Sequence, residues 1–288
     1  MSKARSSIKL FLLGLLLALC VCFGVQALFY FGFDSGTGKT ESNYFSTMSR
    51  FQSASTSAAE IAFAGSSITG RLPGREAGNE RIANLGSDGG NALDGMRSLA
   101  QGKIPTPQWL VIELNTLVGE VGIGDSLVSR GVQGPWFDVS ARMPLLGASS
   151  RPSSMLYAQL LNRQKVLTGE PLEVTIDDLT AVDGKTEEDF SERERRRIKD
   201  IVDAIEHLQQ QGVKILLVNY PEKVVRDSNK IHKEATLGVL RKRLNVIYLD
   251  LGKQIPRNAL QFTDSVHLGP ESAARVLATI TKTIRALN

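Results

Sequence analysis

Two adjacent serines stand where a short apolar run, 60–65 (EIAFAG), ends. The hydroxyl of Ser66 or Ser67 becomes a nucleophile only when a base removes its proton. His267 is a candidate base because it follows Asp264 by three residues, so that the carboxylate can hold one imidazole nitrogen and leave the other free to face a serine. This spacing predicts a Ser-His-Asp triad and hence acyl-transfer chemistry.

Acyl transfer also needs hydrogen-bond donors for the oxyanion that develops on the carbonyl. Segment 84–90 (NLGSDGG) supplies a glycine-rich turn whose backbone N–H groups can approach a ligand closely, and Asn115 follows an apolar run with a side-chain amide that can donate. A rival interpretation makes Asp264 and His267 metal ligands, but no third ligand stands at a recognisable spacing.

Five apolar runs predict the strands that would position these residues: 60–65, 81–86, 109–114, 213–220 and 245–250. Several runs are nearly continuous in Ile, Val and Leu, as in parallel strands that are covered on both faces. Strands that alternate with helical patterns predict an α/β sandwich around a parallel sheet. Ligands of such sheets sit outside the carboxyl ends of the strands, where both serines and Asn115 are expected.

Two helices are predicted with defined ends. Ser191 and Glu194 have the spacing of a capping box, and Gly212 ends the apolar stripe that follows. The last helix begins near Pro270. Its expected inward residues are Val276, Leu277, Ile280, Ile284 and Leu287. Segment 118–160 is rich in Gly, Ser and Pro and does not follow the alternation of strands and helices. It predicts either a partly packed insertion or a lid or partner surface near the site.

The N-terminal segment, 1–33, predicts a membrane anchor. From Leu10 to Phe33 the chain carries no charge over 24 residues, or ~36 Å as a helix, enough to cross a ~30 Å hydrocarbon core. Three basic residues and no acidic one precede this run: Lys3, Arg5 and Lys9. We therefore expect a cytoplasmic N-terminus and an exported remainder. Cleavage as a signal peptide near Ala27 is the alternative.

The exported part divides into an expected linker over 34–57, rich in Ser, Thr and Gly, and one globular domain over 58–288. Without the N-terminal basic residues, 31 basic residues stand against 30 acidic ones, which gives no indication of nucleic-acid binding. Both cysteines, Cys20 and Cys22, lie in the apolar run, so the domain has no disulfide and no thiol ligand. We expect no cofactor and no metal.

These residues together resemble the SGNH (GDSL-type) hydrolase family, whose four sequence blocks occur in this order on a flavodoxin-like three-layer α/β/α fold. The family's Gly-Asp-Ser-Ile/Leu block is matched by 65–68 (GSSI), which gives Ser67 the nucleophile position. The Asp-x-x-His block is matched by Asp264 and His267, which would steady the imidazole and act as the base. Ser66 as nucleophile is the minor alternative. The resemblance spans roughly residues 58–288.

The oxyanion hole that the resemblance implies consists of the Ser67 and Gly89 N–H groups and the Asn115 side chain. Gly89 is the better match to the glycine of the second block, and Gly86 competes with it. Three residues depart from the family pattern around this hole: Ser66, Glu113 and Thr116. These departures touch the surroundings of the oxyanion site and leave the triad intact.

The resemblance implies a serine-dependent ester hydrolase that acts on O-acyl groups, with O-acetyl the expected one, on envelope or extracellular polysaccharide. An O-acyltransferase that moves the acyl group to a glycan hydroxyl is the alternative, and a non-catalytic envelope binding protein is the third hypothesis. The absence of any Asn-x-Ser/Thr acceptor favours a bacterial envelope. We therefore expect a single-pass inner-membrane protein with a periplasmic catalytic domain, and partner proteins of polysaccharide modification.

Overall fold

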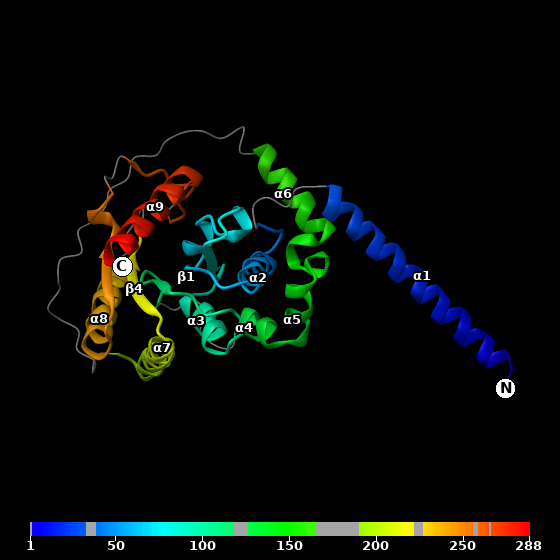
Figure 1. The fold of residues 1–288 in the computed structure, drawn as a ribbon, viewed down its shortest axis with the longest axis horizontal. Coiled ribbons are helices and arrows are strands. Elements are labelled where there is room, and N and C mark those ends of the chain that lie inside the picture. The colour runs from blue at the N-terminus through cyan, green and yellow to red at the C-terminus, as the bar shows by residue number, and fades with distance from the viewer. Residues whose placement is uncertain are drawn as a thin grey trace.

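The computed structural model describes residues 2–32, 39–117, 126–164, 190–221, 227–255, 259–264 and 266–288. These residues form a sheet of five parallel strands in the order β2-β1-β3-β4-β5, the order of flavodoxin-like folds, with helices on both faces (Figure 1). The strands are β1 (Ile61–Gly65), β2 (Ile82–Gly86), β3 (Trp109–Glu113), β4 (Lys214–Asn219) and β5 (Ile247–Asp250). Each lies within a predicted run, which confirms the predicted α/β fold class.

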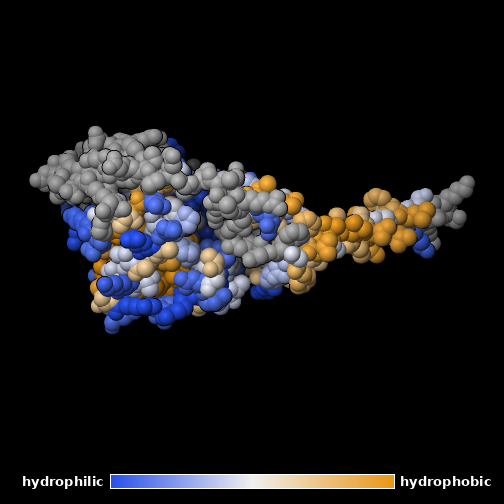
Figure 2. All heavy atoms as spheres, turned by 90° about the horizontal axis from the view of Figure 1, so that it is seen from above, coloured by the Kyte–Doolittle hydropathy of each residue, from blue (hydrophilic) through white to orange (hydrophobic). Residues whose placement is uncertain are grey.

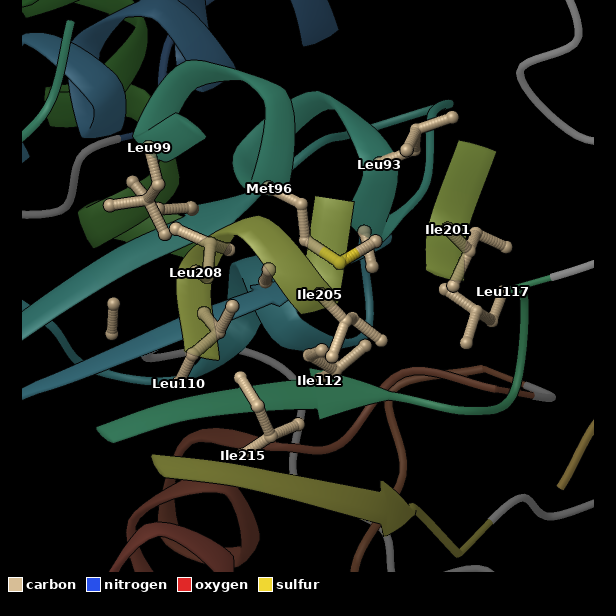
Figure 3. Packing of buried hydrophobic residues seen from close by; sticks show 14 of the residues in the cluster. Leu93, Met96, Leu99, Leu110, Ile112, Leu117, Ile201, Ile205, Leu208 and Ile215 are labelled. Carbon is tan, nitrogen blue, oxygen red and sulfur yellow. The ribbon is translucent and has the colours of Figure 1, made fainter. Parts of the chain in front are cut away.

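Alternate side chains along each strand pack on opposite faces of the sheet. On β3, Leu110 and Ile112 join one hydrophobic layer, while Trp109 and Val111 join the other. Figure 3 shows the first layer, in which apolar side chains of two helices lie over the central strands. Helices α3 (Ala92–Ala100), α7 (Glu192–Gln210) and α8 (Asp227–Arg243) contribute to this layer, and α9 (Pro270–Leu287) to the second.

The two helices predicted with defined ends are confirmed. Helix α7 begins with a capping box in which the Ser191 and Glu194 side chains and backbone N–H groups bond reciprocally. Helix α9 begins at Pro270 and buries four of the five expected residues. The fifth, Leu287, is exposed, because it lies in the last turn of the helix beyond the edge of the sheet layer.

The structure corrects the described part, 39–57, of the expected linker over 34–57, whereas 34–38 lie outside the described residues. Residues Asn43–Ala54 form helix α2, which packs on β2 and buries Met48 and Phe51 completely or nearly so. Ser42 caps the helix by accepting a hydrogen bond from the Phe45 N–H. Spaced apolar residues, hidden in a Ser- and Thr-rich composition, form its inner face. The folded domain therefore begins before residue 58.

The described part of the poorly patterned segment, 126–160, is packed and helical. It forms α4 (Leu127–Gln133), α5 (Pro135–Arg142), two short 3₁₀ turns, η3 (Pro144–Leu146) and η4 (Ala148–Ser150), and α6 (Pro152–Gln164). Six apolar side chains join the buried set: Val128, Val132, Phe137, Ala148, Met155 and Ala158. Residues 118–125 of the predicted lid lie outside the described residues. Residues 126–160 are therefore at least partly packed, as one alternative predicts, while a partner surface on the same segment stays a prediction.

Helix α1 (Ser2–Gly32) projects from the domain (Figure 1). Its 26-residue segment Ser7–Gly32 is the one helix in the described residues that is long and apolar enough to cross a membrane, by length and composition. Both cysteines, Cys20 and Cys22, are free and exposed on it.

Candidate active site

The structure brings Ser67, His267 and Asp264 together, although 200 positions separate the serine from the histidine. His267 Nε2 lies 2.8 Å from Ser67 Oγ, and His267 Nδ1 lies 2.7 Å from Asp264 Oδ2. Because a carboxylate only accepts, Nδ1 donates to Asp264, and Nε2 is left to accept the serine proton. The three groups have the connectivity of a nucleophile, a base and an orienting acid.

A closed loop presents the histidine and the acid at the start of α9. Phe262 and Leu268 pair across it in an antiparallel bridge, and both side chains are buried in the second core layer. Asp264 Oδ1 accepts the N–H groups of Val266 and His267 at 2.9 and 2.8 Å. Burial alone would raise the pKa of Asp264, but these hydrogen bonds outweigh it and hold that pKa at about 2. The acid is therefore ionised at neutral pH.

Ser66 and Ser67 point to different surroundings, although they are adjacent. Ser66 is buried, and its hydroxyl donates to Glu113 Oε1 at 2.7 Å. Ser67 is half-buried, and its hydroxyl faces the imidazole of His267. The geometry therefore favours Ser67 over Ser66 as the nucleophile.

A fully buried carboxylate holds the turn that carries Ser67. Glu113, at the end of β3, is 0% exposed. Its Oε2 accepts the backbone N–H groups of Ser66 and Thr69 at 2.9 and 3.2 Å and the Thr69 hydroxyl at 2.7 Å. Its Oε1 accepts the hydroxyls of Ser66 and Thr116 at 2.7 and 2.9 Å. All three departures from the family pattern, Ser66, Glu113 and Thr116, thus belong to one network.

From the sequence, Glu113 is expected near the oxyanion hole, and its role in holding the turn of Ser66 and Thr69 is not predicted. The available signal was an acidic residue at the end of an otherwise apolar strand. Such a residue is expected to be paired, since an unpaired buried carboxylate is strongly disfavoured. The charge of Glu113 also acts on Tyr220. Burial, and next the Glu113 carboxylate, raise the pKa of Tyr220 well above its ordinary value.

Two glycines after Ser67 had competed for the second-block position, and the structure separates them. The Gly86 N–H already donates to Asn84 Oδ1 at 2.8 Å, and a Cβ on Gly86 would lie 2.2 Å from the backbone nitrogen of Gly70. Gly89 is exposed, with φ +75°, in the turn that follows β2. Within the described residues, the N–H groups of Ser67 and Gly89 donate to no protein acceptor. Gly89 and Ser67 therefore suit an oxyanion site, whereas Gly86 serves close packing.

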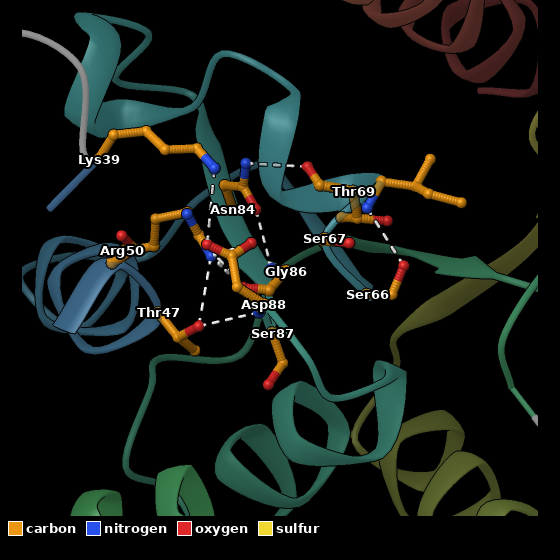
Figure 4. A network of polar contacts seen from close by, with 12 residues as sticks. Lys39, Thr47, Arg50, Ser66, Ser67, Thr69, Asn84, Gly86, Ser87 and Asp88 are labelled. Atoms are coloured by element: carbon orange, nitrogen blue, oxygen red, sulfur yellow. Dashed lines mark hydrogen bonds and ion pairs between the residues drawn. The ribbon is translucent and has the colours of Figure 1, made fainter. Parts of the chain in front are cut away.

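Helix α2 fixes the turn that carries Gly89 (Figure 4). The buried Arg50 side chain donates to the Gly86 carbonyl through Nε and Nη2 at 3.1 and 2.9 Å, and it pairs with Asp88 at 3.0 Å. Lys39 lies 3.8 Å from the same Asp88 carboxylate. Burial lowers the pKa of Lys39 to about 8, with Asp88 opposing the shift and Arg71 adding to it.

Asn115 lies at the end of β3 but bonds to the neighbouring strand. Its Nδ2 donates to the Tyr220 carbonyl at 2.9 Å, and its Oδ1 accepts the Tyr220 N–H at 2.8 Å. These two hydrogen bonds join the segments that follow β3 and β4 at the carboxyl end of the sheet. Asn115 as an oxyanion donor stays a prediction, which requires the second N–H of the amide.

Two histidines remain besides His267. His207 is exposed on α7, where its Nε2 lies 3.0 Å from Gln211 Nε2. The side chain of His232 lies outside the described part. Within the described ranges, no group of three or more His, Cys, Asp or Glu side chains is placed to hold a metal ion.

Comparison with known proteins gives no relative: no family model, no curated protein and no solved structure matches the chain. The chemistry of the site therefore has to be inferred from its geometry.

Proposed function

We propose that this protein is a serine esterase of the SGNH type. The single observation that carries the proposal is the pair of contacts made by His267, 2.8 Å to the Ser67 hydroxyl and 2.7 Å to the Asp264 carboxylate. A half-exposed serine, a base with one nitrogen free and an ionised acid are the parts that acyl transfer requires. The Ser67 and Gly89 N–H groups, which donate to no acceptor within the described residues, support it further.

The proposed reaction uses these groups in sequence. Ser67 Oγ attacks the ester carbonyl while His267 Nε2 accepts its proton, and the Ser67 and Gly89 N–H groups stabilise the oxyanion. Collapse of the tetrahedral intermediate breaks the ester bond, and His267 returns the proton to the leaving alcohol. A water molecule then attacks the acyl-enzyme with the same base, which releases the acid and restores Ser67. Asp264 stabilises the imidazolium in both halves.

We also propose O-acyl groups, with O-acetyl first, on envelope or extracellular polysaccharide as the substrate. Support comes from the resemblance to SGNH hydrolases and from the apolar helix α1, which would anchor the domain beside an envelope. The basic residues before α1 favour a cytoplasmic N-terminus and a periplasmic domain in the inner membrane. Protease accessibility of the domain in intact spheroplasts tests this orientation, and a domain protected until lysis would overturn it.

The catalytic proposal is tested with the full chain in detergent and p-nitrophenyl acetate. We expect nitrophenol release that Ser67→Ala and His267→Ala abolish, while His207→Ala, a matched change of an exposed histidine, leaves the rate unchanged. A fluorophosphonate probe should add its mass to the wild type and not to Ser67→Ala. Equal rates in wild type and Ser67→Ala, without labelling, would refute catalysis and favour a binding module.

Transfer to a sugar hydroxyl would use the same acyl-enzyme with a glycan in place of water. Adding an oligosaccharide to the assay and weighing the products separates the two reactions. Free acetate alone supports the esterase, whereas a glycan heavier by one acetyl group would replace it with the O-acyltransferase.

A further inference from the structure

Helix α1 is exposed from Ser7 to Val25 and partly covered by the domain from Gln26 onward. All side chains from Ser7 to Val25 are exposed, whereas Gln26, Ala27, Phe29 and Tyr30 are partly covered. The cover comes from η3, η4 and α6, which pack against α1, and the Gln26 side chain donates to the Leu145 carbonyl. The domain therefore begins at the level of Gln26.

The uncovered part of α1 has the length of a bilayer core. Segment 7–25 contains 19 residues, or ~28 Å of helix, against a hydrocarbon core of ~30 Å. If α1 spans the membrane as proposed above, then the contacts of its C-terminal end with η3, η4 and α6 bring the domain up to the bilayer. The surface of the domain around η3 lies at the membrane boundary.

That part of the domain carries unusual apolar exposure. Outside α1, the described residues include eight exposed large hydrophobic side chains, and six of them lie on α4, α5 or α6 or directly after α5. Trp136 and Val139 are 60% and 42% exposed, three residues apart on one face of α5, and Met143, directly after that helix, is 52% exposed. Leu156 and Leu160 are 51% and 61% exposed, four residues apart on α6. We call these five residues the α5–α6 patch.

The patch is continuous with the anchor. Met143 directly precedes η3, which holds Gln26 through Leu145, and α6 packs on α1 itself. Figure 1 shows α5 and α6 on the side of the domain from which α1 leaves, and Figure 2 shows the apolar surface of α1 emerging from a domain with many hydrophilic side chains. Tryptophan, with an apolar ring and a polar N–H, is the side chain typical of the membrane–water interface.

We propose that the α5–α6 patch inserts into the headgroup and acyl boundary of the leaflet in which the C-terminal end of α1 emerges. The bilayer is the occupant that the observations favour, because the patch adjoins a helix whose exposed length matches the membrane. Interfacial helices bury their apolar face ~5–10 Å into this boundary. The catalytic domain is then held flat on the membrane by two contacts, and it does not swing on a flexible tether. The inference rests on the proposed anchoring by α1.

The chain offers its own probe, because it contains only two tryptophans. Trp109 is 1% exposed in the core, so a quencher in the lipid reaches Trp136 alone. The full chain is reconstituted in nanodiscs of phosphatidylcholine or of phosphatidylcholine brominated on its acyl chains near the headgroup. We expect bromination to quench the wild-type emission and to leave Trp136→Phe unchanged. Hydrolysis of p-nitrophenyl acetate by both proteins checks that they are folded.

Each other result overturns the proposal in a distinguishable way. A chain that fails to co-migrate with nanodiscs refutes the anchor and the patch together, whatever its esterase activity. A chain that co-migrates with equal emission in both lipids refutes the patch alone. Unquenched Trp136 emission that is shifted to the blue would show that a second copy or another protein covers the patch.

Discussion

Removing the Glu113 carboxylate tests whether one buried anion holds the nucleophile turn. In Glu113→Ala the buried N–H groups of Ser66 and Thr69 lose their acceptor, which lies at 2.9 and 3.2 Å. Each orphaned N–H costs about 1–3 kcal/mol, so we expect a loss of about 2–6 kcal/mol. The hydroxyls of the network can rotate to other acceptors and add less. Such a loss is a large share of the roughly 5–15 kcal/mol that stabilises a typical protein.

Glu113→Gln is expected to be milder because a carbonyl oxygen can replace Oε2 and keep both backbone bonds. Only the charge assistance is lost, about 1 kcal/mol for each bond, or about 2 kcal/mol in total. Glu76→Gln is the matched control. Burial raises the pKa of Glu76, and its Oε1 accepts one hydrogen bond, from the Gly74 N–H at 3.3 Å. Removing that poorly solvated charge should leave stability equal or higher.

Urea unfolding of the full chain in detergent at pH 7 is followed by the fluorescence of Trp109 in the core. It gives the free energies of unfolding of Glu113→Ala, Glu113→Gln and Glu76→Gln relative to the wild type. Esterase rates measured at urea concentrations far below the unfolding transition show whether Ser67 has also moved. A shift of ~1 Å can lower the rate about 10²-fold. We expect Glu113→Ala to be less stable than Glu113→Gln, and the Glu76→Gln control to be at least as stable as the wild type. A Glu113→Ala protein with the wild-type midpoint and the wild-type rate would refute the role of the carboxylate.

Three further changes test other parts of the site. Asp264→Asn removes the charge that stabilises the imidazolium, and it should lower kcat roughly 10³–10⁴-fold with little change in KM, measured by steady-state kinetics. The pKa of Lys39 is lowered from 10.5 to about 8, so the unfolded chain binds more protons between these values and stability should rise with pH across that window. The slope is at most about 1.4 kcal/mol per pH unit, and comparison with Lys39→Gln in urea at pH 8 and 10 isolates it; identical slopes would refute the burial of this amine. Gly86→Ala should lower the melting temperature far more than Gly89→Ala, because the first Cβ meets a backbone nitrogen at 2.2 Å and the second meets only the Asn43 side chain at 3.8 Å, with strain of about 1 kcal/mol from its φ of +75°. Equal melting temperatures would contradict the packing assigned to Gly86.

The strands and the starts of α7 and α9 were predictable because their signals are local. A buried parallel strand is a continuous apolar run, and a capping box such as Ser191 and Glu194 marks a helix start within four residues. The Asp-x-x-His spacing was equally local, since Asp264 bonds to the backbone and ring of His267 within one turn. These features need no knowledge of distant contacts.

Helix α2 and the Glu113 network were missed because their causes lie elsewhere in the chain. The Ser- and Thr-rich composition of α2 resembles that of a linker. Arg50 is buried on α2 because it binds the Gly86 carbonyl, 36 positions away. Glu113 receives its donors from residues 44 and 47 positions away. The partner of Asn115, Tyr220, lies 105 positions away. No local pattern specifies such long-range polar pairs.

The contact between Ser67 and His267 closes a loop of 200 residues, and this has a consequence during synthesis. A ribosome must complete β4, β5 and the start of α9 before His267 exists, so in the proposed reaction every shorter nascent chain carries a Ser67 hydroxyl without its base. Contacts of such long range also form late and slowly in folding. The time at which a serine-directed probe begins to label the protein would therefore report when the loop that carries His267 docks against Ser67.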